Sequence, residues 1–186
     1  MLLFPPEVPR RFLIDPAAYR REPLDRNAIV VRPVGPEQYA ELGRLAADIY
    51  VNEGYALRSQ RGWLEDVAMR ATQGQIFVAL DRNRILGSAM LAKPPSPLAE
   101  LSGPGEGDVR LVTVARFARG QGVGAKLMAA VIDAARADGL KALVLWTQAS
   151  MESAQRLYER LGFVRHPVLD RATNVRTFLG YRLELD

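Results

Sequence analysis

The spacing of apolar residues in the first half of the chain predicts three strands and two helices. Residues 28–34, AIVVRPV, are β-branched and end at a proline, as expected of a strand. Apolar residues recur at helical spacing over residues 36–51 and, more weakly, over residues 62–71. Residues 76–80 and 85–92 then predict two strands joined as a hairpin. The order of this half is therefore β-α-α-β-β.

The second half begins with a strand that is apolar on both faces, which is typical of the centre of a sheet. This strand covers residues 108–115, and strict alternation would place Asp108, Arg110, Val112 and Val114 on one face. The elements predicted after it are, in chain order, a helix over residues 122–138, a buried strand over residues 141–147, a helix over residues 151–161 and an antiparallel strand over residues 177–185.

Together these elements predict an α/β (α+β) fold, with a mixed, mostly antiparallel central sheet and helices on both faces. Residues 93–107 are rich in proline and glycine and predict a long loop, which could act as a flap. Residues 1–27 contain five prolines and no sustained period, which predicts an extended arm outside the core. The predicted organisation is thus an arm over residues 1–27 and a single domain over residues 28–186.

The residue composition limits the chemistry available to the chain. Its 186 residues include no cysteine and one histidine, which excludes disulfides, thiol nucleophiles and cysteine-ligated metals and argues against a histidine metal site. We expect no metal, and chemistry that depends on oxygen acids, backbone amides or an external cofactor. No apolar run approaches the ~20 residues of a membrane span, and the first residues lack the pattern of a secretion signal. The expectation is a cytoplasmic protein without a membrane partner.

The charge of the chain favours a small ligand over a nucleic acid. The formal net charge is +4, and 22 of the 25 basic residues are arginine, which suits planar recognition of phosphate or carboxylate. Basic and acidic residues are mixed along the chain, whereas nucleic-acid binders usually concentrate basic residues in a stripe or tail. An arginine-rich surface without a ligand explains the charge as well, and nucleic-acid binding is indicated only by the pI of about 9.7.

A glycine-rich turn between the central strand and the next helix is the clearest candidate for binding chemistry. It reads Arg119-Gly120-Gln121-Gly122-Val123-Gly124-Ala125. Closely spaced glycines let backbone N–H groups converge on an anion at a helix N-terminus, where the helix dipole favours negative charge. The run also satisfies G-x-G-x-x-A, but no acidic residue follows where a dinucleotide ribose would need one, and no P-loop Gly-Lys-Ser/Thr follows. The turn therefore predicts a phosphate-binding site.

Two motifs resemble those of the GNAT superfamily of acyl-CoA-dependent N-acyltransferases. The first is similar to the family's R/Q-x-x-G-x-G/A pyrophosphate loop, here Arg119, Gly122 and Gly124, and it lies in the segment V-T-V-A-R-F-A-R-G-Q-G-V-G-A-K-L-M. The second is similar to the family's A-x-x-L-Y-x-x-x-G-F element, here Ala154, Leu157, Tyr158, Gly162 and Phe163. It lies in the segment L-V-L-W-T-Q-A-S-M-E-S-A-Q-R-L-Y-E-R-L-G-F. The motifs cover about residues 108–163, and the N-terminal half agrees only in its order of elements.

The resemblance implies acetyl-CoA as the cofactor. The residues expected to bind it are Val112, Val114, Arg119, Gly120, Gln121, Gly122, Val123, Gly124, Ala125, Met151 and Ala154. Backbone amides of the central strand around Val112 and Val114 would stabilise the oxyanion that acyl transfer creates. Met151 stands where many members carry an asparagine that contacts the cofactor arm.

The resemblance also implies roles for three side chains. An amine with a pKa of about 10 is mostly protonated at pH 7, so a base must remove a proton before it attacks. Asp108, on the central strand, is the first choice for this base and Glu106 the second; the alternative for Asp108 is a solvated residue at a strand end. Tyr158 matches the family tyrosine that can protonate the CoA thiolate, and its alternative is a core tyrosine on the apolar stripe of its helix.

The sequence as a whole predicts an N-acetyltransferase that moves an acetyl group from acetyl-CoA directly to a primary amine of a small molecule or a protein. The alternative is a catalytically silent acyl-CoA-binding sensor. The chain could also assemble as a homodimer. No motif identifies the acceptor, and the aromatic residues Trp63, Trp146 and Tyr181 are interpreted as core residues rather than as substrate-stacking ones.

Overall fold

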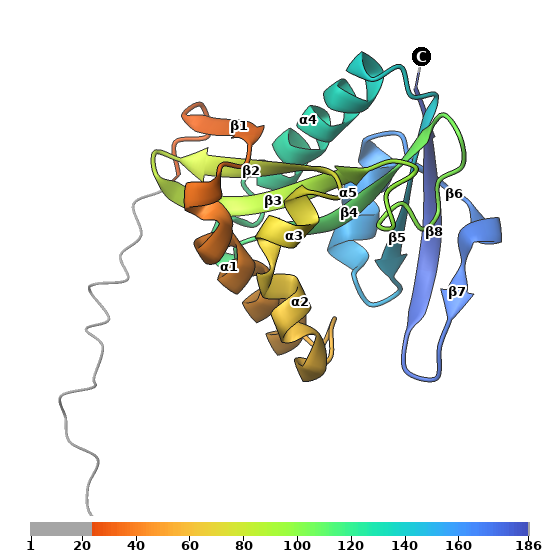
Figure 1. Cartoon of the computed structure of the whole chain (residues 1–186), viewed down its shortest axis with the longest axis horizontal. Helices are drawn as coiled ribbons and strands as arrows, with labels where there is room; N and C mark the ends of the chain where they lie inside the picture. Colours follow the sequence, from red (N-terminus) through yellow and green to blue (C-terminus); the bar gives the residue numbers. More distant parts are fainter. Residues whose placement is uncertain (1–23, 186) are drawn as a thin grey trace, which may run out of the picture.

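A mixed sheet of eight strands forms the centre of the protein (Figure 1). The computed structural model describes residues 24–185. The strands are β1 (Ile29–Pro33), β2 (Gln75–Asp81), β3 (Arg84–Ala92), β4 (Glu106–Val114), β5 (Ala142–Gln148), β6 (Val164–Arg165), β7 (Arg171–Ala172) and β8 (Thr177–Glu184). Their order is β1-β2-β3-β4-β5-β8-β6, and β7 also pairs with β8. In this part of the chain β4 and β5 pair in parallel and the other neighbours are antiparallel, so the predicted fold class is confirmed.

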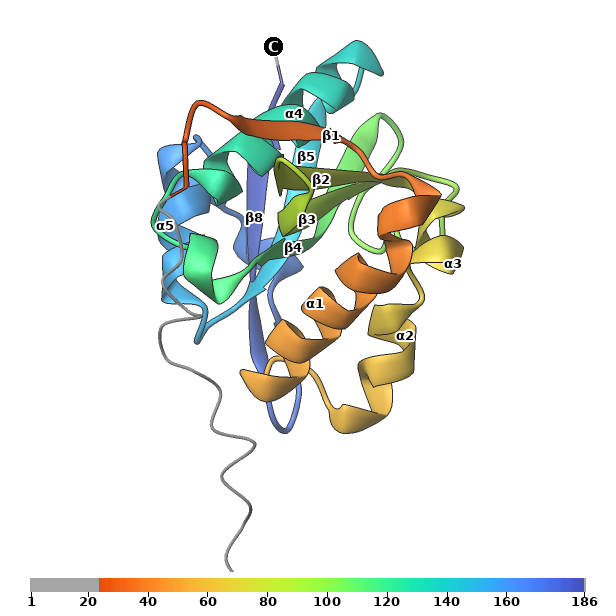
Figure 2. The ribbon, with the colours of Figure 1, turned by 90° about the vertical axis from the view of Figure 1, so that its left-hand side faces the viewer.

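Helices cover both faces of this sheet (Figure 2). They are α1 (Tyr39–Asn52), α2 (Arg61–Glu65), α3 (Val67–Ala71), α4 (Val123–Ala137) and α5 (Glu152–Arg160). One apolar cluster packs α1 and α3 against the sheet through Leu42 and Val67, and a larger one packs α4 and α5 through Leu127 and Tyr158. None of the helices between residues 24 and 185 has the length and apolar character needed to cross a membrane.

The helix that follows the central strand agrees with its prediction. Leu127 and Val131, one turn apart on α4, are completely buried, so the predicted apolar stripe faces the sheet. The helix ends before Gly139, whose φ of +69° is left-handed and favours glycine.

The region predicted as one helix over residues 62–71 contains two short helices. Asp66 lies between α2 and α3, and its side chain accepts a hydrogen bond of 2.9 Å from the backbone N–H of Met69. An aspartate in this position caps the start of a helix, so the chain turns there and begins a new one. The prediction missed this break because the apolar spacing continues across it.

The prediction that residues 1–27 lie outside the core is wrong at the end of that segment. Leu24 is buried in the larger cluster. The rest of the arm, residues 1–23, falls outside the part of the chain that the structure describes.

A β-bulge in β4 corrects the predicted alternation of this strand. The four residues of β4 from Arg110 to Thr113 lie opposite only three residues of β3, from Ser88 to Met90. Leu111 lies within the bulge and has a left-handed φ of +51°. The extra residue places Thr113 on the face of Arg110 and turns Val112 and Val114 to the opposite face, where they pack against the larger cluster.

Strands β4 and β5 pair only near their starts. Their ladder runs from Glu106, opposite Ala142, to Asp108, opposite Val144. Beyond these residues β4 continues beside β3, and β5 continues beside β8 to Gln148. Two neighbouring strands therefore part in the middle of the sheet, and their backbones lack a common ladder there.

Candidate functional site

A cavity of about 570 Å³ lies where β4 and β5 part. Residues of α1, β4, the turn before α4, β5, α5 and β8 line it. The predicted cofactor-binding residues that line it are Val112, Val114, Arg119, Gly120, Gly122, Val123, Gly124, Ala125, Met151 and Ala154. Tyr158 lines it as well, whereas Gln121, Asp108 and Glu106 do not. The structure thus brings both sequence motifs to one cavity.

The glycine-rich turn leaves the first amide groups of α4 beside this cavity. Gly120 and Gly122 have φ values of +73° and +85°, and a Cβ at either position would meet no atom within 4 Å. Glycine is therefore required there by the backbone conformation and not by crowding. Gly122 caps α4, whose initial N–H groups have no partner within the helix and carry the positive end of its dipole. Such an arrangement fits a diphosphate.

Three other residues of the two motifs have packing or local roles. A Cβ at Gly124 would lie 3.0 Å from Cδ2 of Leu157, so glycine lets α4 approach α5. The side-chain amide of Gln121 donates to the carbonyl of Phe117 at 2.9 Å and closes the turn. Met151 is the residue before α5 and accepts a contact of 3.7 Å from the hydroxyl of Thr147 through its sulfur.

The Arg119 side chain is held by a carboxylate that the sequence did not reveal. Its Nη1 and Nη2 donate to the two oxygens of Glu53 at 3.1 and 2.8 Å, and its Nε donates to the carbonyl of Val114 at 3.2 Å. Glu53 also accepts from Nε of Arg116 at 2.9 Å. Burial acts to raise the pKa of Glu53, but the hydrogen bonds from both arginines outweigh it and the pKa is lowered. Glu53 directly follows α1 and lies 66 residues before Arg119 in the sequence, and no sequence motif indicates it.

Tyr158 combines the two environments predicted for it. Its ring packs in the larger cluster, with ring centroids 5.9 Å from Phe163 and 6.2 Å from Tyr181. The residue is 5% exposed and lines the cavity. Burial raises the pKa of its hydroxyl well above the ordinary value, so the hydroxyl carries its proton at neutral pH.

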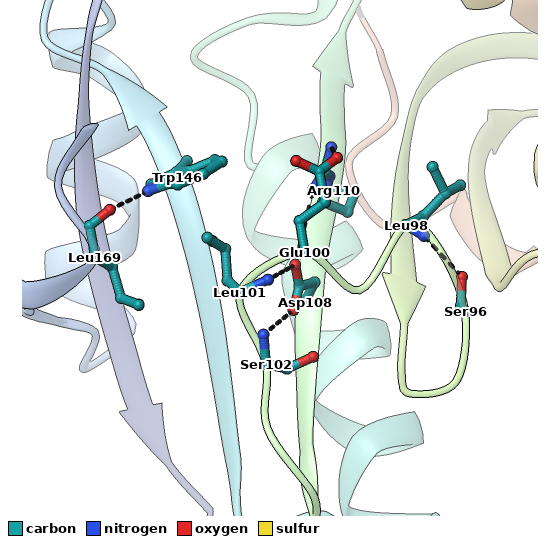
Figure 3. Close-up of polar contacts among 9 residues, drawn as sticks. All are labelled: Ser96, Leu98, Glu100, Leu101, Ser102, Asp108, Arg110, Trp146 and Leu169. Atoms are coloured by element: carbon teal, nitrogen blue, oxygen red, sulfur yellow. Dashed lines mark hydrogen bonds and ion pairs between the residues drawn. The ribbon is translucent and has the colours of Figure 1, made fainter. Parts of the chain in front are cut away.

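Asp108 is buried against the loop that precedes β4 (Figure 3). Its two carboxylate oxygens accept hydrogen bonds from the backbone N–H groups of Leu101 and Ser102 at 2.9 and 2.7 Å. Nη1 of Arg110 lies 3.8 Å from one of them, while Nη2 of Arg110 donates to Glu100 at 2.7 Å. Asp108 therefore anchors the predicted flap to the sheet, and the alternative interpretation of it as a solvated residue at a strand end is wrong.

Glu106 makes contacts that also connect separate segments. It accepts hydrogen bonds from the backbone N–H of Gly103, at 3.0 Å, and from Nη1 of Arg182 on β8. Burial acts to raise the pKa of Glu106, but these two donors outweigh it and the pKa is lowered. The carboxylate is therefore ionised and engaged on both sides.

The remaining part of the cavity has an aromatic lining that the sequence did not indicate. Tyr50, Tyr55, Trp146 and Phe178 line it and are partly buried. The interpretation of Trp146 as a core residue is therefore wrong, and that of Trp63, which is 38% exposed, is wrong as well. Tyr181 is 1% exposed and is a core residue as predicted.

Comparison with known families and proteins agrees with the two motifs. Residues 39–163 match the model described as the acetyltransferase (GNAT) family. The chain is 34% identical over 95 residues to N-alpha-acetyltransferase 30 of Schizosaccharomyces pombe, covering 51% of this chain and 61% of that protein. It is 36% identical over 89 residues to mycothiol acetyltransferase of Rhodococcus jostii, covering 48% of this chain and 28% of that protein. The chain thus spans less than two thirds of the length of these relatives.

Solved structures share the fold. An acetyltransferase of the GNAT family from Staphylococcus aureus Mu50 superimposes with a TM-score of 0.68 at 21% identity, over 86% of this chain and 100% of that one. The structure of yncA from Salmonella typhimurium with its cofactor acetyl-CoA gives a TM-score of 0.64 at 20% identity, over 86% and 95% of the two chains. The family match spans more than half of the sequence, including both motifs that line the cavity. The chain therefore belongs to the GNAT family of acetyltransferases.

Proposed function

We propose that the protein binds acetyl-CoA in the cavity between β4 and β5 and transfers the acetyl group directly to a primary amine of a small molecule or a protein. The observation that carries this proposal is the left-handed turn at Gly120 and Gly122, which presents the start of α4 to a cavity that Tyr158 also lines. The relatives support it, since two of them are an N-alpha-acetyltransferase and a mycothiol acetyltransferase, and yncA is described with acetyl-CoA.

The residues of the turn fit the diphosphate of the cofactor. Its negative charge would lie against the N–H groups between Gly120 and Ala125, where the dipole of α4 is positive. The Arg119 side chain is already bound to Glu53 and Val114, so we assign it the role of holding the turn in shape. When bound, acetyl-CoA supplies an activated acetyl thioester.

Backbone amides of β4 and the hydroxyl of Tyr158 would each act on the thioester during transfer. Beyond Asp108, β4 has no ladder with β5, and Val112 and Val114 line the opening. Backbone amides there are the proposed donors to the acetyl oxygen as negative charge develops on it. Tyr158 holds its proton at neutral pH and is the proposed donor to the departing sulfur.

The proton of the acceptor amine also needs a destination. We assign it to Asp108 first and Glu106 second, as the family resemblance implies. Neither carboxylate is among the cavity-lining residues, so a bridging water would have to carry the proton from the amine to Asp108.

The contacts of Asp108 keep a second function under consideration. Both of its oxygens already accept backbone hydrogen bonds, as expected of a structural anchor. A chain that binds acetyl-CoA without transferring the acetyl group would act as an acyl-CoA sensor.

Release of free CoA distinguishes transfer from binding alone. The chain contains no cysteine, so a chromogenic thiol reagent reports only the thiol of released CoA, without background from the protein. Acetyl-CoA affinity is measured by calorimetric titration, and CoA release is then followed with a panel of primary amines. We expect binding, together with release that depends on an amine. Binding without release for any amine would favour the sensor, and no binding would reject both functions.

A further inference from the structure

Two aromatic pairs line the part of the cavity that lies away from the glycine turn. Tyr50, near the end of α1, meets Tyr55 edge to face, with ring centroids 6.3 Å apart and planes at 75°. Trp146 of β5 and Phe178 of β8 form the second pair, with centroids 5.9 Å apart and planes at 42°. All four residues line the cavity and are partly buried. Each pair therefore offers apolar ring surface to a bound molecule.

Hydrogen bonds place the two pairs side by side, although they come from distant parts of the chain. Nε2 of Gln148 donates to the carbonyl of Tyr55 at 2.8 Å, and Gln148 lies opposite Phe178 in the β5–β8 ladder. Arg176, just before β8, donates to the carbonyl of Gly54 at 3.2 Å. The segment after α1 is thus held against the ends of β5 and β8. The four rings belong to one chamber, which we call the aromatic chamber.

Polar contacts orient the rings of this chamber. Nε1 of Trp146 donates to the carbonyl of Leu169, which fixes the indole in its plane (Figure 3). The hydroxyl of Tyr50 lies 3.5 Å from the carbonyl of Val112, on the bulged strand. Burial raises the pKa of Tyr50 to about 12, so this side chain is neutral at physiological pH. Polar contacts therefore hold two of the four rings, those of Trp146 and Tyr50, in place.

The charged side chains of the cavity disfavour acceptors with several positive charges. Those in its lining, within residues 24–185, are Glu53 and the arginines 110, 119, 156 and 160. The charge of Glu53 is already compensated by Arg116 and Arg119. Arg110 and Arg156 are paired as well, with Glu100 and Glu152. Within residues 24–185 the lining therefore offers a polyamine no uncompensated carboxylate to bind, although aromatic rings alone can attract cations.

We propose that the acceptor is an amine that carries a flat apolar group, such as an aromatic ring, and that the aromatic chamber binds this group. The inference rests on the proposed function, since it treats the chamber as the acceptor side of the transferase. Ring stacking against neutral aromatic side chains supplies the affinity, and the ring directs the amine toward the opening of β4.

Four amines test the chemical class without altering the protein. They are 2-phenylethylamine, 2-cyclohexylethylamine, butylamine and spermidine, which differ in flatness, apolar area and charge. We expect kcat/KM for 2-phenylethylamine to exceed that for butylamine and spermidine by about 10-fold or more, with the cyclohexyl compound between them, because only a flat ring stacks on the aromatic side chains. A 10-fold ratio corresponds to about 1.4 kcal/mol. Equal or better use of butylamine or spermidine would overturn the proposal.

Matched tryptophan variants test the location. Trp146→Leu should raise KM for 2-phenylethylamine about 10-fold and leave acetyl-CoA affinity within about 2-fold. Trp63→Leu is the control, because Trp63 does not line the cavity and its loss should not change KM. Should Trp146→Leu not fold, Phe178→Leu replaces it. An unchanged KM in a folded chamber variant would place the acceptor elsewhere.

A binding measurement separates failure of the inference from failure of the proposed function. Calorimetric titration of 2-phenylethylamine into the CoA-loaded protein requires no transfer. If no amine releases CoA but this titration shows binding that Trp146→Leu abolishes, the transfer function is rejected, and binding of the ring in the aromatic chamber is supported. If the native protein does not bind 2-phenylethylamine, the aromatic chamber is rejected whatever the transfer assay shows.

Discussion

Arg119 and Glu53 join the glycine turn to the end of α1 through a paired contact. Both terminal nitrogens of the guanidinium bind the two carboxylate oxygens, at 2.8 and 3.1 Å, and the Glu53 side chain is only 12% exposed. Such planar pairing is a property of arginine that lysine lacks. Glu53 is also two residues before Tyr55 of the aromatic chamber. One ion pair thus connects the proposed cofactor side of the cavity with its proposed acceptor side.

Removing the charge of Glu53 should loosen the turn. Glu53→Gln leaves Arg119 and Arg116 without their anionic partner, and we expect acetyl-CoA affinity to fall by about 10-fold, as measured by calorimetry. Glu37→Gln is the control, because Glu37 pairs with Arg32 on the exposed surface, neither residue lines the cavity, and affinity should change by less than about 2-fold. Equal affinities in the two variants would show that the ion pair has no part in shaping the turn.

A methyl group at Gly122 should damage binding through the backbone. Ala disfavours the φ of +85°, so Gly122→Ala should cost about 1 kcal/mol of stability and weaken acetyl-CoA binding by about 10-fold or more. Gly139→Ala introduces a similar strain at φ +69°, in equally open space, at the far end of α4. It should lose stability but keep its affinity. Thermal unfolding and calorimetry on both variants provide the comparison, and matching losses of affinity would remove the turn from the site.

The hydroxyl of Tyr158 should matter for turnover more than for stability. Tyr158→Phe keeps the ring packing, and we expect kcat to fall about 10- to 10³-fold with acetyl-CoA affinity within a few-fold. Tyr181→Phe is the matched control: its hydroxyl bonds Glu159 at 3.1 Å, it does not line the cavity, and its loss should cost about 1 kcal/mol without reducing kcat. Full turnover by a destabilised Tyr158→Phe protein would contradict the acid role.

Asp108→Asn tests the first choice of base. If Asp108 takes the proton of the amine, turnover at neutral pH should fall by about 10²-fold or more while acetyl-CoA affinity is kept. The change also replaces one oxygen that accepts from Leu101 or Ser102 with an N–H group, so a loss of stability is expected as well. Glu106→Gln is measured in parallel. A lower unfolding temperature with normal kcat in Asp108→Asn would mean that Asp108 only anchors the loop. A fall in kcat confined to Glu106→Gln would identify Glu106 as the base.

Acid should destabilise the protein through its paired glutamates. The pKa of Glu106 is lowered in the folded state, so the unfolded state binds more protons as the pH falls. The stabilisation is present above the ordinary glutamate pKa of about 4.3 and is lost as the pH drops through the lower folded value. Glu106→Gln should therefore have a lower unfolding temperature at neutral pH and a weaker dependence on pH below about 5. Parallel pH profiles of the two proteins would rule out this linkage.

Local patterns in the sequence determined most of the helices and strands and the cofactor side of the proposed site. Apolar periodicity located the hairpin of β2 and β3 and the buried face of α4, because both depend on residues close in the chain. The glycine turn was recognisable for the same reason, since a left-handed backbone and a helix N-terminus are encoded within a few residues.

Only the tertiary structure decided which side chains surround the cavity. The bulge at Leu111 reversed the faces of Val112 and Val114, and a single inserted residue leaves no mark in an apolar strand. Glu53 met Arg119 across a separation of 66 residues, and Tyr55 met Gln148 of β5 across 93 residues. Asp108 turned from a predicted strand-end group into a buried anchor because the loop before it folded back over its carboxylate. Contacts of this kind depend on how layers pack, and packing joins residues that no local pattern relates.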